Sequence, residues 1–188
     1  MSSAEQVVDT VEITESVELL RKGLEDALGH GILDLPARVV VVDGSNVAYA
    51  VHGPQSKPKV FGIISMRKKL LEHGFIPVCL IGATLKYHID KPDLVRELIK
   101  QEILIEAPAG VSDDRFLIAT VKEFDGFILT NDLFRDILPP QEIDWFIQRR
   151  IAYKFILKTP VLLFPPKTGK QEDDATPKDG KKTDKDAG

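Results

Sequence analysis

The chain has 188 residues, a hydrophobic content of 43% and a formal net charge of −4, which is the size and balance of one globular domain with a sizeable core. Its one cysteine, Cys79, lies in an apolar run and excludes an internal disulfide or a cysteine-rich zinc module. No apolar stretch approaches the ~20 residues that cross a bilayer, and the N-terminus lacks the basic start and apolar centre of a signal peptide. We therefore expect no membrane partner and a cytoplasmic location, or a nuclear one if the source cell has a nucleus.

The N-terminal segment, residues 1–36, is acidic, with eight Asp and Glu residues against one Arg and one Lys. Within it, residues 5–29 have a helical pattern in which Leu20, Leu24 and Leu28 share one face. We expect this helical extension to pack on the domain that follows. The alternative is that it covers a basic surface as a regulatory arm or forms a homodimer.

From residue 37 onward, short apolar runs alternate with helical patterns. The predicted strands are residues 38–42, 76–81, 102–106, 126–130, 153–157 and 161–164. The predicted helices are residues 60–73, 91–101, 113–122, 131–136 and 141–150. Alternation at this spacing predicts an α/β domain over residues 37–166, with a mainly parallel central sheet and helices on both faces.

The C-terminal segment, residues 167–188, contains six lysines and six acidic residues, and only two alanines are apolar. Such a segment cannot bury enough apolar surface to offset its conformational entropy. We expect a disordered charged tail that begins after Pro165-Pro166.

Acidic residues stand at places that such a fold would bring together, each after an apolar run or at the start of a helical pattern. They are Asp43, Asp113, Asp114, Asp132 and Asp136. The loops that follow parallel strands gather at one edge of the sheet, where ligands bind. Carboxylates collected there repel one another unless a cation lies between them, and Mg²⁺ or Mn²⁺ is the cation that prefers oxygen ligands.

The first acidic motif is Asp43-Gly44-Ser45-Asn46, directly after the first predicted strand. Gly44 lets the backbone turn sharply. Asn46 can bind a cation through its amide oxygen, or it can donate a hydrogen bond that orients a carboxylate. The alternative is structural: Asp43 is then a turn residue and Ser45 a helix cap.

The second motif, Ser112-Asp113-Asp114, opens a predicted helix. Ser112 or Asp113 can cap that helix, and acidic residues in a first turn suit the helix dipole. Capping explains one carboxylate there better than two adjacent ones. We therefore expect one of the two aspartates to cap or support the site while the other faces the cation.

The third motif places Asp132 and Asp136 four residues apart, so on a helix they would share one face. Like charges at that spacing are mildly destabilising, and the pair therefore suggests a metal or a cationic partner. Arg135 can pair with a phosphate or with an acid. The alternative is two solvated carboxylates on an outer face.

The charge of the central region points in the same direction. Residues 37–166 contain 17 Lys and Arg residues against 15 Asp and Glu residues, and five of those acids belong to the three motifs. A basic surface around an acidic point suits a polyanionic substrate whose phosphate meets a metal at the centre. The alternative is an ordinary mixed surface.

Three motifs in the same order resemble those of a known family. They are Val-Val-Asp43-Gly-Ser-Asn46-Val-Ala, Ser112-Asp113-Asp114-Arg115-Phe116 and Thr-Asn131-Asp132-Leu-Phe-Arg135-Asp136. Over roughly residues 38–166 the chain resembles the NYN/PIN-like ribonuclease domain of the regnase family, whose members often carry a CCCH zinc finger. With one cysteine, this chain cannot hold that finger.

The resemblance implies a three-layer α/β/α sandwich and an endoribonuclease that uses Mg²⁺ or Mn²⁺ to cleave mostly single-stranded RNA. The implied catalytic residues are Asp43, Asn46, Asp113, Asp114, Asp132 and Asp136. The metal would be held by Asp43, Asp114, Asp132 and Asp136, with Asp113 and Asn46 in supporting roles. Candidates to hold the RNA backbone are Lys57, Lys59, Lys86, Arg115, Arg135, Arg149 and Arg150.

Other functions fit the motifs less well. A non-catalytic RNA-binding or interaction module on the same scaffold would not need the complete set of acids. A phosphatase of the haloacid dehalogenase type needs a second Asp two positions after Asp43, where Ser45 stands. A Rossmann dehydrogenase lacks support because no Gly-x-Gly-x-x-Gly follows a predicted strand.

Overall fold

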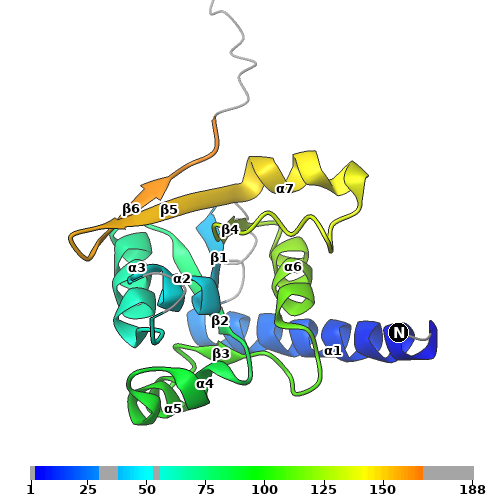
Figure 1. The fold of residues 1–188 in the computed structure, drawn as a ribbon. Helices are drawn as coiled ribbons and strands as arrows, with labels where there is room; N and C mark the ends of the chain where they lie inside the picture. Colours follow the sequence, from blue (N-terminus) through cyan, green and yellow to red (C-terminus); the bar gives the residue numbers. More distant parts are fainter. Residues whose placement is uncertain (1–2, 30–37, 53–55, 167–188) are drawn as a thin grey trace, which may run out of the picture.

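A six-stranded sheet forms the centre of the molecule. The computed structural model describes residues 3–29, 38–52 and 56–166, so the predicted disorder of residues 167–188 lies outside the described residues. The strands are β1 (Val39–Asp43), β2 (Ile76–Ile81), β3 (Ile105–Glu106), β4 (Phe127–Leu129), β5 (Arg150–Ile156) and β6 (Thr159–Leu163). They lie in the order β3-β2-β1-β4-β5-β6, and every neighbouring pair is parallel except β5 and β6 (Figure 1).

Helices cover both faces of this sheet, because each buried strand has apolar side chains on both sides. On β1, Val40 and Val42 pack against α2 (Gly44–Ala50), α3 (Val60–Glu72), α4 (Leu85–His88) and α5 (Pro92–Lys100). Val39 and Val41 pack on the opposite side, against α1 (Ser3–Leu28), α6 (Asp113–Phe124) and α7 (Ile143–Arg149). Figure 1 shows α3 and α6 on opposite sides of the sheet. The predicted three-layer α/β/α fold is therefore confirmed.

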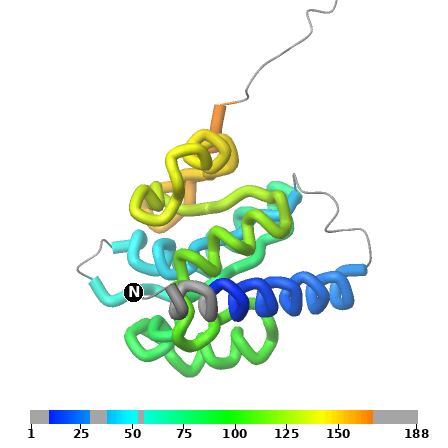
Figure 2. Tube along the Cα trace, turned by 90° about the vertical axis from the view of Figure 1, so that its right-hand side faces the viewer, coloured from blue at the N-terminus to red at the C-terminus, as the bar shows by residue number. Residues whose placement is uncertain are grey.

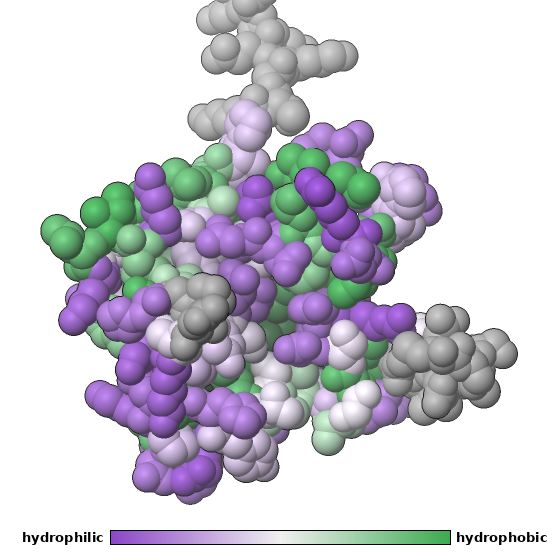
Figure 3. Space-filling view, in the orientation of Figure 1, coloured by the Kyte–Doolittle hydropathy of each residue, from purple (hydrophilic) through white to green (hydrophobic). Residues whose placement is uncertain are grey.

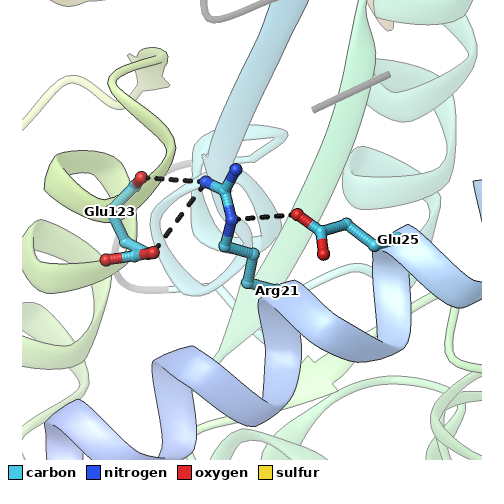
Figure 4. Close-up of polar contacts among 3 residues, drawn as sticks. All are labelled: Arg21, Glu25 and Glu123. Atoms are coloured by element: carbon cyan, nitrogen blue, oxygen red, sulfur yellow. Dashed lines mark hydrogen bonds and ion pairs between the residues drawn. The ribbon is translucent and has the colours of Figure 1, made fainter. Parts of the chain in front are cut away.

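The acidic N-terminal helix α1 packs on the domain through α6, and both ribbon views show the two helices together (Figures 1 and 2). On α1, Nη1 of Arg21 donates to the carbonyl oxygen of Glu123 at 3.2 Å. Nε of the same side chain donates to the Glu25 carboxylate at 3.0 Å (Figure 4). Ile13 and Val17 of α1 are buried in the core on this face. A role for α1 in forming a homodimer stays a prediction.

Element boundaries differ from the predictions at the C-terminal side. The strand expected at residues 153–157 begins earlier, because Arg150 already pairs with Ile128 of β4. As a result α7 ends at Arg149. Free Cys79 is buried in β2, where burial raises the pKa of its thiol to about 12, so it packs as a small core residue.

Two further properties of the molecule are its lack of a membrane-spanning helix among the described residues and a hydrophobic area on its surface (Figure 3). The part of the chain that the structure describes contains no helix that is both long enough and apolar enough to cross a membrane. In the space-filling view, hydrophobic side chains gather at the upper left over the hairpin of β5 and β6 (Figure 3). The hairpin turn there carries Leu157, whose side chain is almost fully exposed.

Candidate active site

Asp43 stands at the carboxyl end of β1, and its side chain is held from two directions. One oxygen, Oδ1, accepts a hydrogen bond from the backbone N–H of Asn46 at 2.9 Å and so caps α2. The other, Oδ2, accepts from the hydroxyl of Thr130 at 2.8 Å, across from β1 at the end of β4. Asp43 is thus the cap of α2, the role that the structural alternative gave to Ser45, and it is also fixed within a wider polar cluster.

Gly44 is required here for a different reason from the one expected. Its backbone φ is not in the left-handed region, so no sharp turn depends on it. A Cβ at this position would lie 2.6 Å from the carbonyl oxygen of Leu80 and 2.8 Å from a side-chain carbon of Ile81. Glycine therefore lets the start of α2 pack directly against the end of β2. This contact brings Ser45 close to Gly82, whose N–H donates to the Ser45 hydroxyl at 3.1 Å.

The carboxyl of Asp43 has a strongly shifted pKa. Burial is the largest cause and raises the pKa of Asp43 from 3.8 to about 6, and the charges of Asp114 and Asp113 add to the rise. The hydrogen bonds from Asn46 and Thr130 act in the opposite direction. A buried carboxylate that also feels two neighbouring negative charges is a place where a cation would be stabilised.

Asp113 and Asp114 lie in the first turn of α6, and the helix is capped by Ser112, whose hydroxyl accepts from the N–H of Arg115. Ser112 is therefore the cap, and both aspartates are available to the site. Burial raises the pKa of Asp114, and the charges of Asp113 and Asp132 raise it further. Asp113, Asp114 and Asp43 line one small hollow together with Gly82.

The side chain of Asp113 occupies the space beside Gly82 that a Cβ would need. A Cβ on Gly82 would lie 2.5 Å from Asp113 Oδ2, and the three heavy atoms nearest to it all belong to the Asp113 side chain. If the chain cleaves RNA, as its resemblance implies, we expect Gly82→Ala to push this exposed side chain aside and to lower cleavage about tenfold, with little change in folding stability. Thermal unfolding and cleavage rates measured on the same preparation check this. Unchanged cleavage would show that the position of Asp113 does not matter.

The helix predicted at residues 131–136 is absent, and this corrects the expectation that Asp132 and Asp136 share a helix face. Asp132 Oδ1 accepts from the backbone N–H of Phe134 at 2.8 Å, and Phe134 has a left-handed φ of 47°. Such a local bond from an Asp side chain competes with helix formation. The turn also buries the Phe134 ring, which packs edge-on against Phe146 at 5.5 Å.

The two aspartates nevertheless line the same open hollow. The residues around it are Asn46, Asn131, Asp132, Leu133, Arg135 and Asp136. This hollow and the one at Asp43 are connected electrostatically, because the charge of Asp132 acts on Asp114. The structure thus places the motifs of Asp43, Asp114 and Asp132 at one edge of the sheet, as the strand pattern predicted.

Sequence reasoning missed the residues that hold these groups in place. Thr130 is fully buried; besides donating to Asp43, its hydroxyl oxygen accepts from the N–H of Asp132 at 3.1 Å. Tyr153 of β5 donates its hydroxyl to Asn46 Oδ1 at 2.6 Å. The available signal was a polar residue, Thr130, at the end of an apolar strand. Nothing in the β5 sequence pointed to Tyr153.

The acids offer oxygen ligands for a hard cation, but they do not form a closed cage around one. Across residues 3–29, 38–52 and 56–166, no group of three or more His, Cys, Asp or Glu side chains is arranged to hold a metal. Mg²⁺ is usually bound through one or two carboxylates, several waters and substrate phosphates. Asp43 and Asp114 fit that requirement, because both residues line one small hollow. Burial is the main cause that raises the pKa of each carboxyl, and the charges of neighbouring aspartates raise it further.

The basic candidates for contacts with RNA differ in what their side chains contact. Three form ion pairs: Lys59 with Asp90 at 3.7 Å, Lys86 with Glu106 at 2.6 Å and Arg149 with Asp125 at 2.6 Å. Arg150 is half-buried and donates to the carbonyl oxygen of Thr130 at 3.3 Å. Arg115 is half-buried, whereas Arg135 and Lys57 are exposed. Arg135 is the candidate that lines the hollow of Asp132 and Asp136.

Comparison with solved structures shows a shared fold. The crystal structure of nuclear proteinaceous RNase P 2 (PRORP2) from A. thaliana matches 82% of this chain with a TM-score of 0.58 and 20% identity. A second structure of Arabidopsis thaliana nuclear protein-only RNase P 2 matches 82% with a TM-score of 0.57 and 20% identity. The chain spans only 36% and 37% of those two proteins.

The sequence itself identifies the family. Residues 36–174 match the family described as the Zc3h12a-like ribonuclease NYN domain. The matched region contains all three acidic motifs and agrees with the resemblance to NYN/PIN-like ribonucleases. The chain therefore belongs to the Zc3h12a-like ribonuclease NYN domain family.

Proposed function

We propose that this chain is an endoribonuclease that uses Mg²⁺ or Mn²⁺ to hydrolyse phosphodiester bonds of mostly single-stranded RNA. The observation that supports this most directly is the electrostatic coupling of Asp43, Asp114 and Asp132 at one edge of the sheet. These residues come from the end of β1, the start of α6 and the loop after β4. Family membership supports the nuclease activity.

The residues have distinct roles in this proposal. Asp43, Asp114, Asp132 and Asp136 would hold the metal, and the chemistry it would supply is polarisation of the scissile phosphate and a lower pKa of a bound water. Asp114 is half-buried, and burial followed by the charges of Asp113 and Asp132 raises the pKa of its carboxyl. We assign to it the acceptance of a proton from the attacking water. Asp113 supports the negative potential of the site.

The open hollow beside Asp132 suits an extended strand. It is not enclosed by other elements, and Arg135 lies in it, exposed and without an ion pair to any described residue. A guanidinium there can bind a phosphate group through two hydrogen bonds. Lys57, also exposed, is a further candidate for a backbone contact.

The test compares wild-type protein with Asp132→Asn on labelled single-stranded RNA. We expect cleavage with Mn²⁺, none with excess EDTA, and a loss on the order of 10²–10³-fold in the variant. Asp144→Asn serves as a matched control, because Asp144 is an exposed acid on α7. Full activity of Asp132→Asn would refute the site assignment.

A circular single-stranded RNA separates the two cleavage modes. An endonuclease converts the circle to a linear product, whereas an exonuclease needs a free end. RNA binding by wild-type protein without cleavage of either substrate would favour the non-catalytic interaction module.

A further inference from the structure

The side-chain amide of Asn46 has a fixed orientation. Its Oδ1 lies 3.2 Å from the backbone nitrogen of Asn131 and 2.6 Å from the hydroxyl of Tyr153. A backbone N–H can only donate a hydrogen bond, so the amide atom that faces Asn131 is the oxygen. Tyr153 must then also donate to it. Both partners are distant in sequence, and together they occupy the oxygen that a metal would need.

The nitrogen of the same amide remains available to the site. Among the described residues, Nδ2 of Asn46 donates to no protein acceptor. Asn46 lines the open hollow beside Asp132, Arg135 and Asp136. Because the amide is planar and its two polar atoms share one carbon, the nitrogen points in a different direction from the oxygen that faces Tyr153 and Asn131.

We propose that Asn46 serves as a hydrogen-bond donor to a phosphate oxygen of the substrate rather than as a metal ligand, and that Tyr153 is the positioning residue that fixes this orientation. The inference rests on the proposed nuclease function and specifies the role of one residue in it. An N–H donor among carboxylates has a clear use, since it binds a phosphate that the acids alone would repel.

Tyr153 is well suited to hold the amide. Its side chain is buried in the core, and its ring packs edge-on against Phe155 at 6.1 Å. Burial, together with the charge of Asp43, raises the pKa of its hydroxyl. The hydroxyl therefore keeps its proton across the working pH range and remains a donor.

The backbone of Tyr153 is fixed as well. The side chain of Asn131 donates to its carbonyl oxygen at 3.0 Å and accepts from its N–H at 3.1 Å. These two bonds tie the loop after β4 to β5, next to the pairing of Leu129 with Ile151. Asn131 thus contacts Asn46 directly through its N–H and indirectly through Tyr153.

The experiment uses Asn46→Ala, Asn46→Asp, Tyr153→Phe and the double variant Asn46→Ala/Tyr153→Phe in the full chain. Mn²⁺ affinity is measured without RNA, and kcat and KM are measured on single-stranded RNA. We expect Asn46→Ala to bind Mn²⁺ within about twofold of wild type, because the oxygen is not a ligand. We expect both Asn46 variants to lose at least about tenfold in kcat, because Asp keeps the oxygen but lacks the donor.

Tyr153→Phe keeps the ring and removes only the hydroxyl, so we expect kcat to fall about three- to tenfold with KM unchanged. In the Asn46→Ala background the same change should have no further effect, since the amide it positions is gone. Tyr49→Phe is the matched control: Tyr49 lies on α2, the helix of Asn46, and packs against the core, and its hydroxyl makes no hydrogen bond to any described residue. It should retain wild-type kcat.

Specific results would overturn the inference. A tenfold or larger loss of Mn²⁺ affinity in Asn46→Ala would make Asn46 a metal ligand. Wild-type activity of Asn46→Asp would exclude the donor role, and an equal effect of Tyr153→Phe in both backgrounds would show that its hydroxyl does not act through Asn46. Wild-type protein that binds Mn²⁺ but cleaves no RNA would refute the proposed function alone. Wild-type protein that binds no Mn²⁺, either alone or with RNA present, would contradict both.

Discussion

Asp43→Asn should abolish metal-dependent cleavage and, in the absence of metal, make the folded protein more stable at neutral pH. The loss of activity follows from the removal of a central carboxylate, and we expect it to exceed about 10³-fold. The gain in stability follows from the environment of Asp43. Burial is the main cause that raises the pKa of its carboxyl from 3.8 to about 6, so folding opposes ionisation of this group.

The pH dependence has a definite sign. Because the folded protein binds this proton more tightly than the unfolded chain, stability falls as pH rises from about 4 to about 6 and stays low above that. The loss amounts to roughly 1–3 kcal/mol for a shift of this size. Asparagine cannot ionise and avoids the loss. The variant should therefore exceed wild type in stability at pH 8 and match it near pH 4.

Urea denaturation in EDTA at several pH values measures this difference. Asp144→Asn is the control, since it removes an exposed carboxylate outside the site and should show no comparable gain. Added Mn²⁺ should stabilise wild type more than Asp43→Asn, because a ligand that binds only the folded state raises its stability. Equal stability of wild type and Asp43→Asn at every pH would show that burial does not raise the pKa of the Asp43 carboxyl.

The positions of Asp43 and Asp132 could be predicted from the sequence because they depend on strand pattern alone. An apolar run such as Val39–Val42 is compatible with burial on both faces of a parallel sheet, and the residue after it must stand at the carboxyl edge. Asp43 and the motif after β4 satisfy this rule. The strand predicted at residues 76–81 coincides with β2, which lies directly beside β1.

The local geometry could not be predicted in the same way. Asp132 and Asp136 have helical spacing, but the side chain of Asp132 bonds to the N–H of Phe134 and the ring of Phe134 is buried. Together this local hydrogen bond and the burial of Phe134 outweigh the few tenths of a kcal/mol per residue that helix propensity supplies. Hydrogen bonds across strands, such as Tyr153 to Asn46, depend on register and leave no local signal.

Thr130→Val should lower both activity and stability, because one hydroxyl joins two acidic residues. Thr130 is fully buried, and valine has nearly its shape. The change leaves Asp43 Oδ2 without its donor and the N–H of Asp132 without its acceptor. Unsatisfied groups of this kind cost about 1–3 kcal/mol in folding stability. We expect a fall of at least about tenfold in kcat, which corresponds to about 1.4 kcal/mol.

The pH profile separates this role from simple packing. The hydrogen bond from Thr130 lowers the pKa of Asp43, so its loss should raise that pKa further. If cleavage needs ionised Asp43, the acid limb of the kcat/KM profile should move to higher pH in Thr130→Val. Thr130→Ser keeps the hydroxyl and should restore the wild-type limb, even though it loses a buried methyl group. A destabilised Thr130→Val with an unchanged acid limb would mean that Thr130 supports the fold and leaves the ionisation of Asp43 untouched.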